Sequence, residues 1–327
     1  MPKSPPAQTT AERNGPPRSG DRPKGEDSES TGVNGDQSDD SAGGAGAAYV
    51  FVRNGTTWSQ QAYLKASNTS GGDTFSRDVA ISGDVILVGA DFEDSSATGV
   101  DGDQSDNSAI SAGATYVFVR DGSTWIQLAY LKASNADSFD FFGQGVAISG
   151  NKAVVGAFNE DSGSTGVNGD QGNSDAGASS DAAYVFDISE KIGASYCVGA
   201  PNSVSPIGAR IVAFGDTSVV AEDLTLIGID VPNSFGLFFY GPLQFMTPFG
   251  DGVRCLGGST QRLQPPVPAT DNFLVRAVDF SEPSAAGILT AGANNAALNF
   301  QLWYRDPMGP GGNGFNATDG REITFQP

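Results

Sequence analysis

Histidine is absent from this chain of 327 residues. Without an imidazole, the chain has no His-based general acid or base, no Ser–His or Cys–His nucleophile pair, and none of the commonest ligands of zinc and iron. This absence is the strongest argument that the sequence offers against a hydrolase. We therefore expect a protein that is not an enzyme.

Basic residues are scarce, since 18 lysines and arginines stand against 38 aspartates and glutamates, for a formal net charge of −20. Nucleic acids and anionic membranes attract basic surfaces, so this balance argues against both as partners. No segment approaches the ~20 apolar residues of a transmembrane helix, so we expect no membrane insertion. Clustered carboxylates can, however, hold cations.

Cysteine occurs only twice, at Cys197 and Cys255. Two thiols cannot supply the ligands of a four-cysteine zinc site. The two residues would form a disulfide in an exported protein, but the sequence by itself leaves their pairing open.

Glycine, in contrast, is abundant at 44 residues, alongside many Asn, Asp and Ser. This composition favours short strands joined by turns. Residues 1–25 are rich in proline, glycine and charge, and we expect them to be disordered. They lack the apolar stretch of a secretion signal. Directly after them, Glu26-Asp27-Ser28 matches Glu93-Asp94-Ser95 of the next repeat, so the chain begins inside a repeat. We therefore expect that the start of the protein is truncated or misassigned.

A sequence motif returns at a fixed interval of 67 residues. Residues 32–39 (GVNGDQSD) recur as 99–106 (GVDGDQSD), and the first six positions recur again at 166–171 (GVNGDQ). A unit that keeps its length this well is a supersecondary module stacked on its neighbours. Such architectures usually scaffold or bind, which argues further against catalysis.

Each repeat is predicted to contain four antiparallel strands. Asn54-Gly55 is a two-residue hairpin signal, and Ser82-Gly83-Asp84 marks a second tight turn. Two consecutive hairpins fit one propeller blade better than a solenoid, which remains an alternative. The strands are expected at 48–53, 58–65, 78–81 and 85–89.

A loop of roughly twenty residues, 91–113, is expected to connect one blade to the next and is far longer than the usual 4–6 residues. Its carboxylates are closely spaced, and Gly102 would permit the sharp turn that calcium loops need. Solvated, turn-forming loops explain the same residues, so both interpretations stay open. The candidate calcium ligands are Glu93, Asp94, Asp101, Asp103 and Asp106, with Asp36 and Asp39 in the first copy and Asn168 and Asp170 in the third.

Residues 195–327 show no internal repeat, and they contain both cysteines. Strands broken by glycine and proline predict a compact antiparallel β-sandwich. Four aromatic residues here could form a sugar-binding platform, although core packing explains them better. These residues are Phe239, Tyr240, Trp303 and Tyr304.

Two short motifs alternate within the repeats. Phe142-Gly143 precedes Val146-Ala147-Ile148, and Val155-Gly156-Ala157 follows on the next expected strand, as Val88-Gly89-Ala90 does one copy earlier. This pattern resembles the FG-GAP repeats of integrin-α-like propellers. It departs from them at Phe75-Ser76, where the second glycine is missing, and neither copy has the proline after Gly-Ala.

The FG-GAP resemblance covers about residues 26–190 and implies an incomplete β-propeller of four-stranded blades. Calcium-binding members of that family carry an Asp-x-Asp/Asn-x-Asp-Gly loop between the two motif strands. Here only Ser82-Gly83-Asp84 and Ser149-Gly150-Asn151 stand at those positions, too short to surround an ion. The family's calcium site is therefore not expected there.

The C-terminal part is similar to a domain found at the end of secreted, repeat-containing bacterial proteins. The similarity rests on residues 235–241 (FGLFFYG), 248–252 (PFGDG), 255–258 (CLGG) and 299–306 (NFQLWYRD). It implies export and a disulfide between Cys197 and Cys255, and it implies no reaction.

Together these observations predict an all-β protein: an incomplete β-propeller of four-stranded FG-GAP-type blades followed by an antiparallel β-sandwich. We expect an extracellular or cell-surface scaffold for binding or adhesion, with an unidentified extracellular protein or glycan as ligand and calcium as a candidate cofactor. A closed propeller needs four to eight blades, and this chain has at most three, so exposed blade edges would allow self-association. The alternatives are a carbohydrate-binding module and a propeller glycosidase, for which no matched carboxylate pair stands out.

Overall fold

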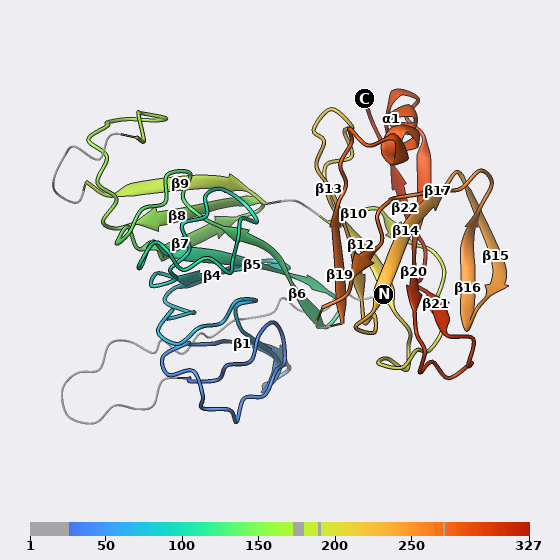
Figure 1. Cartoon of the computed structure of the whole chain (residues 1–327), viewed down its shortest axis with the longest axis horizontal. Helices are drawn as coiled ribbons and strands as arrows, with labels where there is room; N and C mark the ends of the chain where they lie inside the picture. The colour runs from blue at the N-terminus through green and yellow to red at the C-terminus, as the bar shows by residue number, and fades with distance from the viewer. Residues whose placement is uncertain (1–25, 173–179, 189–190, 271) are drawn as a thin grey trace. The chain divides into compact units, whose positions relative to one another are not determined.

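The computed structural model describes residues 26–172, 180–188, 191–270 and 272–327 (Figure 1). The chain divides into two compact units, one up to residue 188 and one from residue 189. The disorder expected for residues 1–25 lies outside the described residues. Among the residues described, no helix is long and apolar enough to span a membrane.

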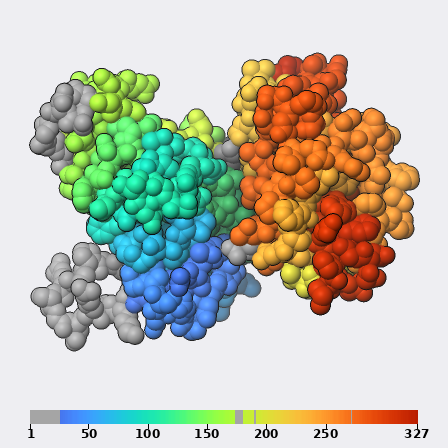
Figure 2. Space-filling model, in the orientation of Figure 1, coloured from blue at the N-terminus to red at the C-terminus, as the bar shows by residue number. Residues whose placement is uncertain are grey.

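The first unit consists of three antiparallel sheets that lie side by side, coloured blue to green in Figure 1. In the space-filling view they form one continuous body of packed atoms (Figure 2). The first sheet contains β1 (Ala48–Asn54) and β2 (Thr57–Leu64); the second contains β3 (Val79–Ser82), β4 (Val85–Ala90), β5 (Ala114–Asp121) and β6 (Thr124–Leu131); the third contains β7 (Phe142–Ser149), β8 (Lys152–Ala157) and β9 (Ala182–Asp187).

The four-stranded sheet combines strands from two successive repeats. The strands lie close to where they were predicted, but β3 and β4 pair with β5 and β6 of the next repeat, and β1 and β2 form a sheet of their own. The predicted grouping of residues 48–89 into one blade was therefore wrong. The acidic loop 91–113 consequently joins two adjacent strands, β4 and β5, of the same blade rather than two blades.

The first hairpin turn lies one residue later than predicted, whereas the second has Gly83 and Asp84 at its centre as predicted. Asn54 pairs with Thr57, so the central residues of the first turn are Gly55 and Thr56 rather than Asn54 and Gly55. Gly55 has a φ of 61°, and a glycine at the first central position is the mark of a type II′ turn. This turn matches the twist of the flanking strands.

Side chains along the second sheet alternate between two cores, as the two-residue period of a strand requires. On β4, Ile86 and Val88 pack toward the first sheet, whereas Leu87 packs toward the third. On β5, Tyr116 packs toward the first sheet and Val117 toward the third. The central blade is therefore buried on both faces.

The glycines of the two repeat motifs meet between neighbouring blades. A Cβ atom on Gly89 of β4 would overlap the carbonyl oxygen of Gly143 on β7. Gly143 has a φ of 91°, and Ser76 has a φ of 74° one copy earlier. Only a residue without a side chain fits at Gly89, which lets adjacent sheets approach closely.

The second unit is an antiparallel sandwich, and the prediction of an all-β protein is confirmed. One sheet has the order β10-β12-β13-β19 and the other β11-β22-β20-β14-β17, with β18 pairing β14, β21 pairing β20, and β15-β16 as a separate hairpin. The elements are β10 (Lys191–Ile192), β11 (Ala194–Ser195), β12 (Arg210–Gly215), β13 (Leu224–Ile229), β14 (Phe235–Gly241), β15 (Leu243–Phe249), β16 (Gly252–Gly257), β17 (Gln261–Arg262), β18 (Val267–Pro268), β19 (Phe273–Ala277), η1 (Pro283–Ala285), α1 (Ala286–Ala293), β20 (Ala297–Arg305), β21 (Phe315–Ala317) and β22 (Arg321–Thr324).

One core joins the two sheets of the sandwich. It contains Leu226 of β13 and Leu274 of β19 together with Phe238 of β14 and Leu302 of β20. The short helix α1, which the sequence analysis did not predict, contributes Ile288 to the same core.

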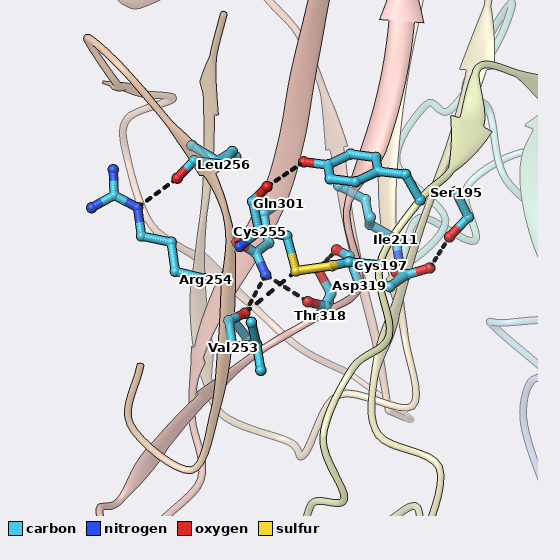
Figure 3. Close-up of a disulfide and its surroundings, with 12 residues drawn as sticks. Ser195, Cys197, Ile211, Val253, Arg254, Cys255, Leu256, Gln301, Thr318 and Asp319 are labelled. Carbon is cyan, nitrogen blue, oxygen red and sulfur yellow. Dashed lines mark hydrogen bonds between the residues drawn. A yellow bond between two sulfur atoms is a disulfide. The ribbon is translucent and has the colours of Figure 1, made fainter. Parts of the chain in front are cut away.

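Cys197 and Cys255 form a disulfide, with their Cα atoms 6.3 Å apart (Figure 3). The buried side chain of Gln301 lies beside it and accepts a hydrogen bond from the Cys255 N–H at 2.9 Å. Its amide nitrogen donates to the carbonyl oxygens of Val253 and Thr318, each at 2.7 Å. Gln301 thereby satisfies three backbone groups on two segments around the disulfide, two on β16 and one at Thr318.

Candidate functional site

A glutamate at the start of the second acidic loop is buried and ion-paired. Glu93 is 1% exposed, and its carboxylate accepts hydrogen bonds from Lys132 Nζ at 2.9 Å and Tyr130 Oη at 2.8 Å. Asn68 Nδ2 donates to the same carboxylate at 3.1 Å. The lysine itself is 0% exposed. Glu93 therefore anchors the loop to the last strand of the blade.

The first copy repeats this cluster. Glu26 accepts hydrogen bonds from Lys65 Nζ at 2.8 Å and from Tyr63 Oη. Burial lowers the pKa of Lys65 and of Lys132, and the neighbouring glutamate opposes that shift in each case. The sequence signal was the recurrence of Tyr-x-Lys at the repeat interval, which the sequence analysis did not connect to the acidic loops.

Asp101 also joins the loop to the same strand, through both its backbone and its side chain. Asp101 N–H donates to the carbonyl oxygen of Tyr130, and Asp101 Oδ1 accepts from Tyr130 N–H, both at 2.8 Å. Asn34 makes the same pair of contacts with Tyr63. Asp101 and Asn34 have φ values of 53° and 59°, a left-handed conformation that Asp and Asn tolerate better than most residues. This geometry accounts for the exchange of Asn and Asp at these positions.

The other predicted calcium ligands of these loops accept hydrogen bonds from backbone N–H groups of the loop itself. Asp103 Oδ1 accepts a hydrogen bond from Ser105 N–H at 2.9 Å, and Asp106 Oδ2 accepts one from Ser96 N–H at 2.8 Å. Hydrogen bonds from the Ser96 side chain and backbone lower the pKa of Asp106 to about 2. Three other carboxylates of these loops also accept hydrogen bonds from backbone N–H groups: Asp94 Oδ1 from Ser111, Asp36 Oδ1 from Ser38, and Asp39 Oδ2 from Glu29.

This arrangement does not fit a calcium ion. Calcium requires six to eight oxygen ligands that converge on one point, whereas these carboxylates face N–H and O–H donors and lie in different directions. Glu93 points inward to Lys132, and Asp103 lies exposed on the turn. Among the described residues, no group of three or more acidic or cysteine side chains is placed to hold a metal. From this geometry we expect the loops to bind no calcium, and melting experiments test that expectation.

The third copy has the glutamate without the strand that would pair with it. Glu160 is 3% exposed and accepts hydrogen bonds from Asn135 Nδ2 at 2.9 Å and Ser162 Oγ at 3.0 Å. At the repeat interval of 67 after Tyr130 and Lys132 stand a cysteine and a glycine, which belong to the second unit. The third copy therefore has no Tyr-x-Lys strand of its own.

A hollow of about 760 Å³ lies at the open edge of the third sheet. It is lined by β9, by Glu160 and Ser162, and by the Gly166–Gly169 segment. In the second copy, the matching segment is covered by the end of β6, where Val100 pairs with Leu131. The hollow is thus the position of a fourth strand, which we call the open slot.

One of the predicted calcium ligands, Asn168, lines this site, and Asp170 lies two residues after it in the sequence. Asn168 lines the open slot and has a φ of 54°, as its counterparts do in the filled copies. Asp170 Oδ1 accepts a hydrogen bond from Gly172 N–H at 3.0 Å and so forms a turn. The sequence analysis selected this loop, but for its acidity rather than for its missing strand.

The aromatic platform considered for the sandwich is not formed. Phe239, Tyr240 and Tyr304 are buried, the last at 0% exposure. Tyr240 Oη donates to the Ser284 carbonyl oxygen, and Tyr304 Oη accepts from Asn202 Nδ2. Tyr240 and Tyr304 pack in the core between the two sheets, whereas Phe239 and Trp303, the residues before them on β14 and β20, lie on the opposite face because side chains alternate along a strand.

A family model described as FG-GAP repeat matches residues 58–118 and 125–186. Each match runs from the last strand of one sheet through the third strand of the next, β2 to β5 and β6 to β9. The second match therefore ends at the strand that borders the open slot. A comparison with curated proteins found no match.

Proposed function

From the premise that residues 58–118 and 125–186 are FG-GAP repeats, we propose that this chain is an extracellular or cell-surface binding scaffold. Its third blade takes an extended segment of a partner protein as a fourth strand. FG-GAP repeats generally serve as non-catalytic scaffolds, and we propose no reaction for this chain.

The observation that carries this proposal is the unfilled edge of β9. The equivalent strand β5 pairs with β4 on one side and β6 on the other, whereas in the described part of the chain β9 pairs only with β8. An unpaired edge presents a row of backbone donors and acceptors to any extended segment. Strand addition to such an edge is a general mode of peptide recognition.

The outer face of the same blade is also exposed. Val185 of β9 is 69% exposed and Val154 of β8 is 40% exposed, although their counterparts Val117 and Leu87 are fully buried. In the second blade those counterparts pack against the third blade. A partner that supplies a strand can therefore also cover apolar surface, which stabilises the complex.

Titration of the full chain with a labelled peptide tests the proposal. The peptide has the sequence of residues 124–135 (TWIQLAYLKASN), which contains the strand that fills the second blade. Saturable binding should protect the amides of β9 and of Gly166–Gly169 from hydrogen exchange. A scrambled peptide of the same composition is the control. Failure of both peptides to bind, or protection elsewhere in the chain, would contradict the proposal.

A further inference from the structure

The open slot contains the carboxylate of Glu160, which can discriminate between partner strands of different sequence. Resting on the proposed strand-accepting function, we propose that the slot selects a partner segment with a tyrosine and a lysine two residues apart. The lysine ammonium pairs with Glu160, and the tyrosine hydroxyl donates to the same carboxylate.

The first two copies, in which the strand with Tyr-x-Lys is present, show which groups donate hydrogen bonds to the glutamate. Glu26 and Glu93 each bind a lysine that is 0% exposed, at 2.8 and 2.9 Å, together with the phenol of the tyrosine two residues before it. Buried ammonium groups require a carboxylate partner. The selection therefore follows from pairing chemistry that the fold already uses twice.

The frame around the glutamate is the same in the open copy. Asn68 Nδ2 donates to Glu93, and its Oδ1 accepts from Tyr116 Oη at 2.6 Å. Asn135 makes the matching contacts with Glu160 and, also at 2.6 Å, with Tyr184 Oη. Glu160 is thus held in position for a lysine and a tyrosine that the described part of the chain does not supply.

Ser162 occupies part of the lysine's place. Its hydroxyl donates to Glu160 Oε2 at 3.0 Å, whereas the equivalent hydroxyl of Ser95 donates to the carbonyl oxygen of Asp103 at 2.8 Å. A hydroxyl can rotate between such acceptors at little cost. Binding of a lysine would turn Ser162 toward the carbonyl oxygen of its own loop.

The charges at the slot favour a cationic segment. Glu160 and Asp181 line it, and Lys132, which also borders it, is already paired with Glu93. The whole chain has a net charge of −20, so a basic segment is attracted over longer distances too.

We assign the occupant to a separate partner protein rather than a second copy of this chain. The chain's own strands of this sequence, β2 and β6, are already paired with β1 and β5. A second copy would have to break one of these hairpins to supply its strand.

A binding cycle with two peptides and two chains tests the selection. The native 124–135 peptide and its Lys132→Gln form are titrated against the native chain and the Glu160→Gln chain. The native chain should prefer the lysine peptide by about 10-fold or more, the range of a hydrogen bond between charged groups. The Glu160→Gln chain should bind the two peptides within about 2-fold. Asp181→Asn, which changes the other lining carboxylate, should keep the preference.

The outcomes separate the two proposals. Equal binding of both peptides to the native chain, with protection of β9, would refute the lysine selection and leave the strand-accepting function standing. Absence of peptide binding would overturn both. Dimerisation that the peptide cannot displace would assign the slot to a second copy and overturn the choice of partner. A cooperative unfolding transition above the assay temperature shows that the Glu160→Gln chain is folded and that its binding data report on the slot.

Discussion

Removing the carboxylate of Glu93 should destabilise the first unit severely. Gln in its place keeps the shape and can still accept the hydrogen bonds from Tyr130 and Asn68. It leaves Lys132 as a fully buried ammonium without a counter-charge. The free energy of unfolding should therefore fall by far more than the loss of one hydrogen bond.

The expected size follows from the burial of both partners. Breaking a buried ion pair by removing one member costs about 3–5 kcal/mol. A domain of this size is typically stable by only 5–15 kcal/mol. Removing both charges, as Glu93→Gln with Lys132→Met, should restore most of the loss, because no unpaired charge then remains.

Urea unfolding followed by the fluorescence of Trp125 measures this cycle. Trp125 is fully buried in the first unit, and phenylalanine in place of Trp58 and Trp303 removes the other signals. Glu160→Gln is the matched control, since that carboxylate is equally buried but accepts no lysine. We expect it to cost about 1.5–3 kcal/mol, the range for a hydrogen bond to a charged group.

Two results would refute the reasoning. Equal costs for Glu93→Gln and Glu160→Gln would show that the lysine contributes nothing particular. A coupling energy between Glu93 and Lys132 below about 1 kcal/mol would place the pair among ordinary surface salt bridges.

Three further predictions concern pH, the disulfide and calcium. Burial above all raises the pKa of Asp73 in the folded protein to about 7, against about 3.9 in the unfolded chain, so the free energy of unfolding should fall by about 4 kcal/mol as pH rises from below 3.9 through 7. Asp73→Asn should flatten this fall in melts from pH 4 to 8, and an unchanged pH profile would contradict the shift. Cys255→Ser opens the bridge to Cys197, which spans 58 residues, and should cost the second unit about 4 kcal/mol while the Trp125 transition stays in place. Melts of the first unit in about 10 mM calcium and in chelator should coincide for the native chain and for Asp103→Ala; a calcium-selective rise in melting temperature that Asp103→Ala abolishes would establish the loop as a calcium site.

The strands themselves could be predicted because their signals are local. The β-rich run at 48–53 and the glycine of the following turn depend on neighbouring residues alone. The motif glycines Gly89 and Gly143 also identified the repeat family without any coordinates, although the reason for them, the close approach of two sheets, needed the structure.

The grouping of strands into blades was decided only by tertiary structure. A strand's alternating pattern is the same whichever neighbour it pairs with, so the sequence could not show that β4 pairs with β5 across the long acidic loop. For the same reason, the loop was predicted to connect two blades, although it joins two adjacent strands of one blade.

The function of the acidic residues was likewise beyond local reasoning. Composition and spacing showed that the loops are rich in carboxylates, and the chemistry of a carboxylate depends on what surrounds it. Glu93 pairs with a lysine 39 residues away. Glu160, in the same motif, pairs with no lysine of the described residues, because the chain leaves the repeat before the matching strand. The sequence by itself determined the repeated unit and its strands. Tertiary structure decided which contacts were made and where a strand was missing, because those depend on segments far apart in the chain.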